Sequence, residues 1–180
     1  MITPREPEHS ARTLRLRPLQ PADEAEFLAG HRAMKADGFV LGLGLETTSS
    51  WPEYLRQLAD ERQGRNLPAD RVPSTFLVAD VGGVIVGRTS IRHELTEYLR
   101  REGGHIGYGV LPQHRRRGYA TEILRQSLVI ARSYGIGEVL VTCDENNTGS
   151  IAVIERCGGR LDSVVTRTPP AAPVRRYWID

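Results

Sequence analysis

The segment from Gln113 to Ala120 has the composition of an anion-binding loop. It reads Gln-His-Arg-Arg-Arg-Gly-Tyr-Ala, and an amphipathic helix is expected to begin near Tyr119. The first turn of a helix has unpaired backbone N–H groups and the positive end of the helix dipole, and glycine lets a ligand come close to the backbone. Arginine side chains add charge-assisted hydrogen bonds to the same ligand. The loop is therefore a candidate phosphate site.

A bare arginine triplet is more often a solvated turn or a nucleic-acid patch than a small-ligand site, so its context matters. The preceding strand, expected over His105 to Leu111, has Gly107 and Gly109 on one face. Glycine inside a strand often marks a place where a ligand or another backbone comes close. The opposite face is apolar and would pack on the core, through Ile106, Tyr108 and Val110. This context favours a small-ligand site with an open glycine face.

The same loop is the first part of a longer pattern. Residues Arg115 to Ala120 read Arg-Arg-Arg-Gly-Tyr-Ala. They fit the order Arg or Gln, two residues, Gly, one residue, then Gly or Ala. This order is the acyl-CoA signature of the GNAT superfamily of N-acyltransferases, which the sequence resembles. A second segment similar to that family follows at the expected distance, from Asn147 to Ser150 and on to Cys157-Gly158-Gly159. The resemblance covers roughly residues 75 to 165.

The resemblance implies an α+β fold with a central mixed sheet of about six to seven strands flanked by helices. It implies that the strands His105 to Leu111 and Glu138 to Cys143 splay apart, with the pantetheine arm of acetyl-CoA, the expected cosubstrate, between them. A backbone N–H near Val110 would polarise the thioester carbonyl. The residues that the resemblance assigns to cosubstrate binding are Gly109, Val110, Leu111, Arg115, Arg116, Arg117, Gly118, Tyr119, Ala120, Asn147 and Ser150.

Acylation of an amine needs a group that removes a proton, because a lysine-like amine with a pKa of about 10.4 is mostly charged at neutral pH. His105 is the first candidate, since it would share a strand face with Gly107 and Gly109 and imidazole titrates near neutral pH. The family more often has glutamate at about this point, and a structural histidine bonded to a neighbouring loop is an equal alternative. Glu94, beside His93, is the second candidate, although a solvated turn explains it more simply.

The group that reprotonates the leaving thiolate is not assigned. The family often uses a tyrosine in the helix that follows the Asn147 segment, and this chain has Ile154 there. A covalent route through Cys143 is discounted, because no partner histidine can be placed beside it and a lone cysteine at a strand end usually packs. Three tyrosines are alternatives that packing also explains: Tyr108, Tyr134 and Tyr177.

Hydrophobic periodicity predicts the elements that position these residues. Strands are expected over residues 13–19, 75–79, 84–92, 105–111, 138–143, 159–166 and 174–179, and helices over residues 21–35, 51–63, 120–134 and 148–157. Gly82-Gly83 predicts a hairpin, and the alternation of strand and helix from residue 105 predicts parallel pairing at the centre with antiparallel edges. Residues 94–101 are expected as a short helix or a loop, and the Gly- and Leu-rich residues 39–48 as a loop over a pocket.

Length and composition suit a single domain over residues 1–180, with residues 1–11 as a flexible tail. The chain is 39% hydrophobic and 26% charged, with a formal net charge of +2. A chain of this length can bury a core without disulfides or metals, and near-neutral charge gives no general reason to expect nucleic acid. No apolar run reaches membrane-spanning length and no signal peptide is recognised. Cys143 and Cys157 are expected as reduced thiols, with no metal site, in the cytoplasm.

We therefore predict an acetyl-CoA-dependent N-acetyltransferase that transfers an acetyl group to a primary amine of a small molecule or peptide, by direct attack in a ternary complex. The alternative is a non-catalytic acyl-CoA-binding or sensing domain, because the usual tyrosine is missing. The acceptor would be chosen by residues 39–48, 96–104 and 168–175, whose composition does not name it. A monomer and a homodimer are both open, and neither a membrane nor a nucleic-acid partner is expected.

Overall fold

The computed structural model describes residues 13–180, so the tail expected over residues 1–11 lies outside the described part. Within that part the strands are β1 (Leu14–Arg17), β2 (Ser74–Val81), β3 (Val84–Arg92), β4 (Ile106–Val110), β5 (Val139–Asp144), β6 (Arg160–Val165) and β7 (Val174–Ile179). The α-helices are α1 (Glu24–Ala36), α2 (Trp51–Arg62), α3 (Tyr119–Ser133) and α4 (Thr148–Arg156). Each of these elements overlaps one that the periodicity predicts.

The strands form one seven-stranded mixed sheet in the order β1-β2-β3-β4-β5-β7-β6. β4 and β5 are parallel, and every other neighbouring pair within the described sheet is antiparallel. β7 is inserted between β5 and β6, so the chain returns to the sheet interior at its end. The predicted mixed sheet, with parallel pairing at its centre and antiparallel edges, is confirmed.

The hairpin between β2 and β3 forms where the glycine pair predicts it. Gly82 and Gly83 have φ angles of 62° and 88°, as a turn that matches the right-handed twist of the strands requires. The side chain of Asp80 accepts a hydrogen bond of 3.0 Å from the backbone N–H of Gly83, which closes the turn. This hairpin fixes the register of β3, the strand that lies beside β4.

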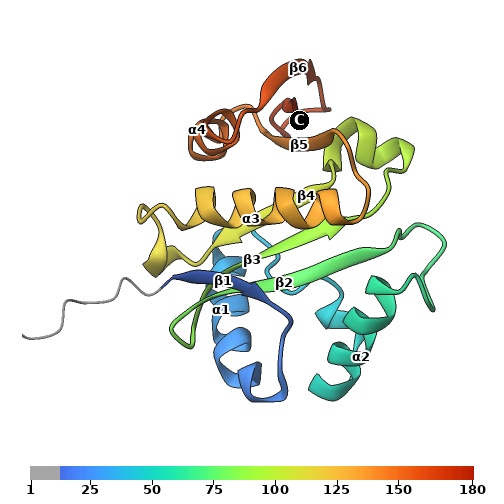
Figure 1. Cartoon of the computed structure of the whole chain (residues 1–180), viewed down its shortest axis with the longest axis vertical. Helices are drawn as coiled ribbons and strands as arrows, with labels where there is room; N and C mark the ends of the chain where they lie inside the picture. Colours follow the sequence, from blue (N-terminus) through green and yellow to red (C-terminus); the bar gives the residue numbers. More distant parts are fainter. Residues whose placement is uncertain (1–12) are drawn as a thin grey trace, which may run out of the picture.

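Helices cover both faces of the sheet (Figure 1). Helices α3 and α4 pack on one face, in a core that includes Ile91, Ile106, Leu124, Leu128, Val141 and Ile154. Helices α1 and α2 pack on the other face, in a core that includes Phe27, Met34, Trp51, Tyr54, Phe76 and Val78. In β2 alternate residues point to different cores, because Phe76 and Val78 pack with α1 and α2 whereas Ala79 and Val81 pack in a cluster with Ile123 of α3.

The parallel contact between β4 and β5 is confined to one residue pair, Ile106 with Val141. Beyond that pair the remaining residues of β4 continue without a partner on the β5 side, so the two strands splay as the family resemblance implies. The pairing begins at His105, whose backbone N–H donates to the carbonyl of Leu140 at 2.7 Å. An opening between two central strands exposes main-chain groups that elsewhere in the sheet are paired.

The connection between β3 and β4 is the region that periodicity describes least well. The short helix or loop expected over residues 94–101 is a loop followed by a helical turn, which continues as a π-helix over Leu99–Gly103 and packs against β5 and β7. Gly104 follows with a φ of 64°, and its backbone N–H donates to Leu99 at 2.6 Å. This sharp entry starts β4 at Ile106, one residue later than predicted.

Candidate active site

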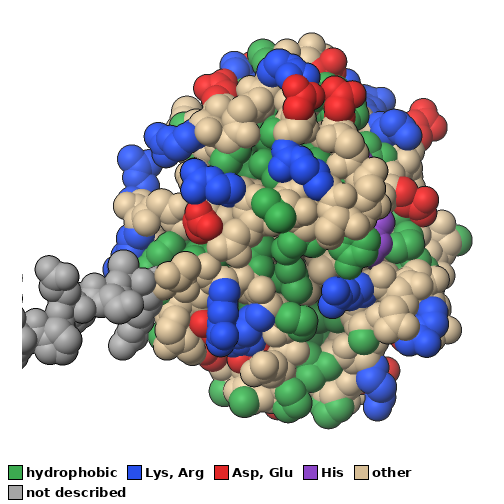
Figure 2. All heavy atoms as spheres, in the orientation of Figure 1, with side chains coloured by type: hydrophobic (Ala, Val, Ile, Leu, Met, Phe, Trp, Pro, Cys, Tyr) green, Lys and Arg blue, Asp and Glu red, His purple; other side chains and the backbone are tan. Residues whose placement is uncertain are grey.

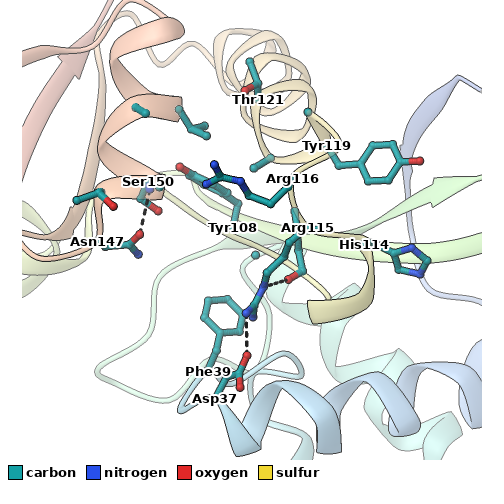
Figure 3. Close-up of a pocket in the computed structure, with 18 of the residues that line it drawn as sticks. Asp37, Phe39, Tyr108, His114, Arg115, Arg116, Tyr119, Thr121, Asn147 and Ser150 are labelled. Carbon is teal, nitrogen blue, oxygen red and sulfur yellow. Dashed lines mark hydrogen bonds and ion pairs between the residues drawn. The ribbon is translucent and has the colours of Figure 1, made fainter.

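A cleft of about 970 Å³ lies beside the unpaired end of β4 (Figure 3). Its wall is made by the end of α1 and the loop after it, by β4, by the loop that precedes α3, and by the first turns of α4. Most of the residues predicted to bind the cosubstrate line this cleft: Gly109, Val110, Arg115, Arg116, Gly118, Tyr119, Ala120, Asn147 and Ser150. Leu111 and Arg117 do not, because Leu111 is buried in the core beside α1 and Arg117 points to solvent.

The loop before α3 has the backbone geometry of an anion site. Arg116 and Gly118 have φ angles of 63° and 80°, so the chain turns twice through the left-handed region within three residues. Gly118 is the N-cap of α3 and no side chain caps the helix there. The N–H groups of the first turn are therefore available to a ligand, at the positive end of the dipole. These features fit the pyrophosphate of a coenzyme A molecule.

The arginines of the loop differ in what they contact. Arg115 turns toward α1: its Nη1 lies 2.8 Å from a carboxylate oxygen of Asp37, and its Nε donates to the carbonyl of Val110 at 3.2 Å. Arg116 points into the cleft, toward Tyr108 and α4 (Figure 3). Within residues 13–180 no hydrogen bond or ion pair of the Arg116 side chain is found. Arg115 therefore holds the loop against α1, and Arg116 offers its charge to the cleft.

Strand β4 directs backbone groups into the splay. The N–H of Leu111 bonds to the carbonyl of Val86 on β3 at 2.9 Å. Because N–H groups alternate in direction along a strand, the N–H of Val110 points the other way, toward the opening. On the glycine face, a Cβ atom at Gly109 would meet the ring of Phe39 at 2.7 Å. The face predicted to be open is thus covered by Phe39, which itself lines the cleft.

The hydroxyl groups of Tyr108 on β4 and Ser150 on α4 line the same side of the cleft. Asn147 caps α4, and its side-chain oxygen accepts the N–H of Ser150 at 3.0 Å. The hydroxyl of Tyr108 lies near Ser150 but reaches no hydrogen-bond partner within the described chain, although it is buried. Burial raises the pKa of Tyr108, with the nearby Ser150 side chain acting in the opposite direction. Tyr108 is therefore a protonated phenol whose donor is available at the wall of the cleft.

The two predicted proton acceptors lie away from this cleft. Nδ1 of His105 accepts a hydrogen bond of 2.9 Å from the backbone N–H of Leu140, and the ring packs edge-on against Trp178. Burial, with the charges of Arg100 and Arg92, lowers the pKa of His105 to about 4. Glu94 is exposed in a bend after β3. Neither residue lines the cleft, and the geometry of His105 favours a structural role.

Ile154 and Cys143 both contact the core that α3 and α4 form with the sheet. Ile154 is fully buried in the core between α3 and α4, so the position that carries tyrosine in many relatives does not face the cleft with a donor. Burial raises the pKa of the Cys143 thiol to about 11, which keeps it protonated at neutral pH. A protonated thiol is a poor nucleophile, which argues against a covalent route through Cys143.

No group of three or more His, Cys, Asp or Glu residues in the described chain is placed to hold a metal ion. The helices of residues 13–180 are also all too short or too polar to cross a membrane.

Comparison with known families decides what this arrangement is. The model of the acetyltransferase (GNAT) domain matches residues 13–160. The chain belongs to the GNAT acetyltransferase family. Its family membership confirms the resemblance drawn from Arg115 to Ala120 and from the Asn147 segment. A search of curated protein sequences finds no match.

Solved GNAT structures share this fold at low sequence identity. RimJ from Mycobacterium smegmatis, in complex with CoA-disulfide, has a TM-score of 0.69 and 23% identity over 94% of this chain and 82% of its own. The putative acetyltransferase yncA from Salmonella typhimurium, with acetyl-CoA, has a TM-score of 0.61 and 16% identity over 92% of each chain. Spermidine N-acetyltransferase from Vibrio cholerae, with CoA and spermine, has a TM-score of 0.62 and 17% identity over 92% and 94%. These similarities confirm the GNAT fold.

The sequence reasoning missed the contribution of α1 to the site. Met34, Asp37 and Phe39 line the cleft, and Asp37 pairs with Arg115 across a long stretch of chain. The signal available was the apolar segment beginning at Phe39, which was expected over a pocket without a named partner. A long-range ion pair such as Asp37 with Arg115 has no local pattern that would reveal it.

Proposed function

We propose that this GNAT protein is an acetyl-CoA-dependent N-acetyltransferase that acts on a primary amine of a small molecule or peptide. The observation that carries the proposal is the uncapped N-terminus of α3, preceded by left-handed turns at Arg116 and Gly118, at one end of a cleft that runs to the splay. Phosphate would bind at the loop and the thioester would lie near Val110. The proposal keeps the cytoplasm as the location, with a monomer or a homodimer.

The chemistry is a direct transfer in a ternary complex. The neutral amine nitrogen attacks the thioester carbonyl carbon, a C–N bond forms, the C–S bond breaks, and the amine proton is lost while the thiolate gains one. The N–H of Val110, directed into the splay, would stabilise the oxyanion. Tyr108 would donate its proton to the thiolate, because its hydroxyl is buried at the cleft wall and unpaired within the described chain.

His105 and Glu94 remain predictions as proton acceptors, but the site does not favour either. The hydrogen bond from the N–H of Leu140 occupies Nδ1 of His105, the nitrogen that would take the proton. The pKa of His105 is also lowered to about 4, so the ring is a weak base. A water chain that reaches solvent from the amine is the remaining route for the proton. The proposal therefore assigns the donor to a residue and the acceptor to water.

A non-catalytic acyl-CoA-binding domain is the second candidate, because Ile154 stands where many relatives have tyrosine and is buried in the core. Release of free CoA from acetyl-CoA, measured over a panel of primary amines and followed by mass spectrometry of the acetylated product, separates the two. Product that depends on the amine supports the enzyme. Acetyl-CoA binding without any acetylated amine in the panel would favour the binding domain instead.

Nucleic-acid binding through the arginine loop receives no support from the surface. On the face seen in Figure 2, lysine and arginine side chains are interspersed with acidic and uncharged groups and form no continuous basic stripe. The formal net charge is only +2. A protein that binds nucleic acid through phosphate contacts typically gathers its basic residues on one face.

A further inference from the structure

The ring of Phe39 occupies the space that a side chain at Gly109 would need. A Cβ atom placed on Gly109 would lie 2.7 Å from Cζ and 2.8 Å from Cε1 of that ring, and 3.1 Å from Cε of Met34. Distances below 3.0 Å are shorter than the contacts that Cβ atoms make in proteins. The glycine in β4 therefore makes room for a phenyl ring that comes from the loop after α1.

The backbone on both sides of Phe39 is anchored. Its N–H donates to the carbonyl of Met34 at 3.0 Å, at the end of α1. The guanidinium of Arg88 lies 4.6 Å from the centre of the ring and donates through Nη2 to the carbonyl of Val40 at 2.8 Å. Leu41, one residue further, is fully buried in the core of α1 and α2. The cation–π contact and the anchored loop hold the ring in one place.

The ring closes the side of the cleft that faces α1. Tyr108 packs with the clusters beneath α3 and α4, whereas Gly109, the next residue of β4, points to the opposite side of the sheet. Phe39 lines the cleft from that opposite side, and Figure 3 shows its ring pointing from the loop after α1 toward β4. A coenzyme A held by the loop before α3 would pass its arm through the splay. Its acyl group would then point toward Phe39.

The ring is close to the backbone group proposed to bind the thioester. The Cα atom of Gly109 and the nitrogen of Val110 are two covalent bonds apart, so the nearest ring carbon lies no more than about 7 Å from that nitrogen. A thioester oxygen that accepts the Val110 N–H places the acyl methyl about 4 to 5 Å from the same nitrogen. An acetyl methyl directed to this side is therefore within van der Waals distance of the ring, and a longer chain would overlap it.

Phe39 also has a packing role, because part of its side chain contacts the core of α1 and α2. The side chain is only partly buried, however, and it lines the cleft together with Gly109 and Val110. Met34, which is 2% exposed, supports the same wall from α1. The acyl group would thus meet two apolar side chains, of which only Phe39 has an exposed part.

We propose that Phe39 limits the length of the acyl group and restricts the donor to acetyl-CoA. The inference rests on the proposed N-acetyltransferase function and names the residue that selects the donor at the same site. The selection is steric, since an anchored ring cannot move aside for additional methylene groups without strain. The segment beginning at Phe39, expected from the sequence to choose the acceptor, therefore begins with a residue that faces the donor.

Calorimetric titration with free CoA, acetyl-CoA and butyryl-CoA tests the proposal without turnover. For each protein, the Kd of an acyl-CoA is divided by the Kd of free CoA, so that any effect of a substitution on the phosphate loop cancels. In the wild type this ratio is larger for butyryl-CoA than for acetyl-CoA by about tenfold or more, because two additional methylene groups must displace the ring.

The variants change the size of the side chain that covers Gly109. In Phe39→Ala the ratio for butyryl-CoA falls to that for acetyl-CoA or below it, because the additional methylene groups are buried in the space left by the ring. Phe39→Leu keeps a smaller apolar side chain there, gives an intermediate ratio, and replaces Phe39→Ala if that variant does not fold. Val40→Ala is the matched control. Its side chain is 43% exposed and does not line the cleft, so the wild-type ratios are retained.

The outcomes separate this inference from the proposed function. Equal ratios for the two acyl-CoA molecules in the wild type, or a tenfold difference that persists in the folded Phe39 variants, overturns the role of Phe39 and leaves the acetyltransferase standing. If the wild type binds neither free CoA nor acetyl-CoA, the proposed function fails and the inference fails with it. A difference that is lost in Phe39→Ala and kept in Val40→Ala supports the inference, whichever amine is the acceptor.

Discussion

The backbone N–H of Leu140 donates a hydrogen bond of 2.9 Å to Nδ1 of His105, across the start of the contact between β4 and β5. An imidazole nitrogen that accepts a hydrogen bond carries no proton, so the proton of the neutral ring is on Nε2. The two residues are bonded twice, because the N–H of His105 also donates to the carbonyl of Leu140. His105 therefore anchors the strands at the point from which they splay.

This bond predicts how stability depends on pH. The pKa of His105 is lowered to about 4 in the folded protein, against about 6.5 in an unfolded chain. Above pH 6.5 the ring is neutral in both states, and between pH 6.5 and 4 only the unfolded state gains the proton. The free energy of unfolding therefore decreases as pH falls through this window, by less than about 3 kcal/mol because the ring is not fully shielded from solvent.

Urea unfolding at pH 7 and pH 5 measures that decrease for the wild type and for His105→Asn, whose side-chain oxygen can still accept the Leu140 N–H. The variant is expected to show a smaller decrease, because the titrating ring is gone. Equal decreases in the two proteins would show that His105 is protonated equally in the folded and unfolded states.

Tyr108→Phe tests the assigned proton donor. The hydroxyl is buried and unpaired within the described chain, so its removal is expected to leave the free energy of unfolding unchanged or slightly increased. We expect kcat to fall by about 10- to 100-fold, the lower part of the range for general acid catalysis, because a thiolate is a tolerable leaving group. The KM for acetyl-CoA should change little. A kcat equal to that of the wild type would remove Tyr108 from the mechanism.

Arg116→Ala tests whether the arginine that points into the cleft contacts phosphate. Loss of one charge-assisted contact should raise the Kd for acetyl-CoA by about 10-fold and weaken its dependence on salt concentration. Arg32→Ala, at an exposed arginine on α1, is the control and should leave the Kd unchanged. Calorimetric titration at low and high salt measures both effects. If the two variants behave alike, the Arg116 side chain does not contact the phosphates.

Cys143→Ala tests the exclusion of a covalent route. Its thiol is protonated at neutral pH because burial raises its pKa to about 11. We expect the variant to keep its turnover within about threefold, with a modest loss of stability from lost packing. Intact-protein mass spectrometry after rapid quenching is the second measurement. An acetyl group trapped on the wild type and absent from Cys143→Ala, together with lost turnover, would establish an acyl-cysteine intermediate.

Much of the fold followed from local patterns. The hairpin at Gly82-Gly83, the helix α3 and the loop from Arg115 to Ala120 each have a signal that depends only on neighbouring residues. Their positions in the structure agree with those signals because backbone conformation at glycine and helical periodicity are set locally. The splay between β4 and β5 followed from the family resemblance rather than from any local pattern.

The position of His105 does not follow from the alternation of side chains along a strand. A strict period of two would place His105 beside Gly107 and Gly109. Instead, Gly104 has a left-handed φ and the strand begins abruptly after it. The N–H of His105 donates a hydrogen bond to Leu140 on β5, and its carbonyl accepts one from the N–H of Arg92 on β3. The alternation therefore begins only after His105. No pattern of side-chain types reveals that change of phase, because it arises in the backbone of the preceding turn.

The central claim is that the loop before α3 binds acetyl-CoA, and calorimetric titration of acetyl-CoA into three proteins tests it most directly. Gly118→Glu places a carboxylate at the proposed phosphate site. Gly135→Glu is the matched control at the other end of α3, with a φ of 81° against 80° and equally open space at its Cβ. Micromolar binding to the wild type and to Gly135→Glu, lost in Gly118→Glu, is the predicted result. Equal binding in all three proteins, or none to the wild type, would contradict it.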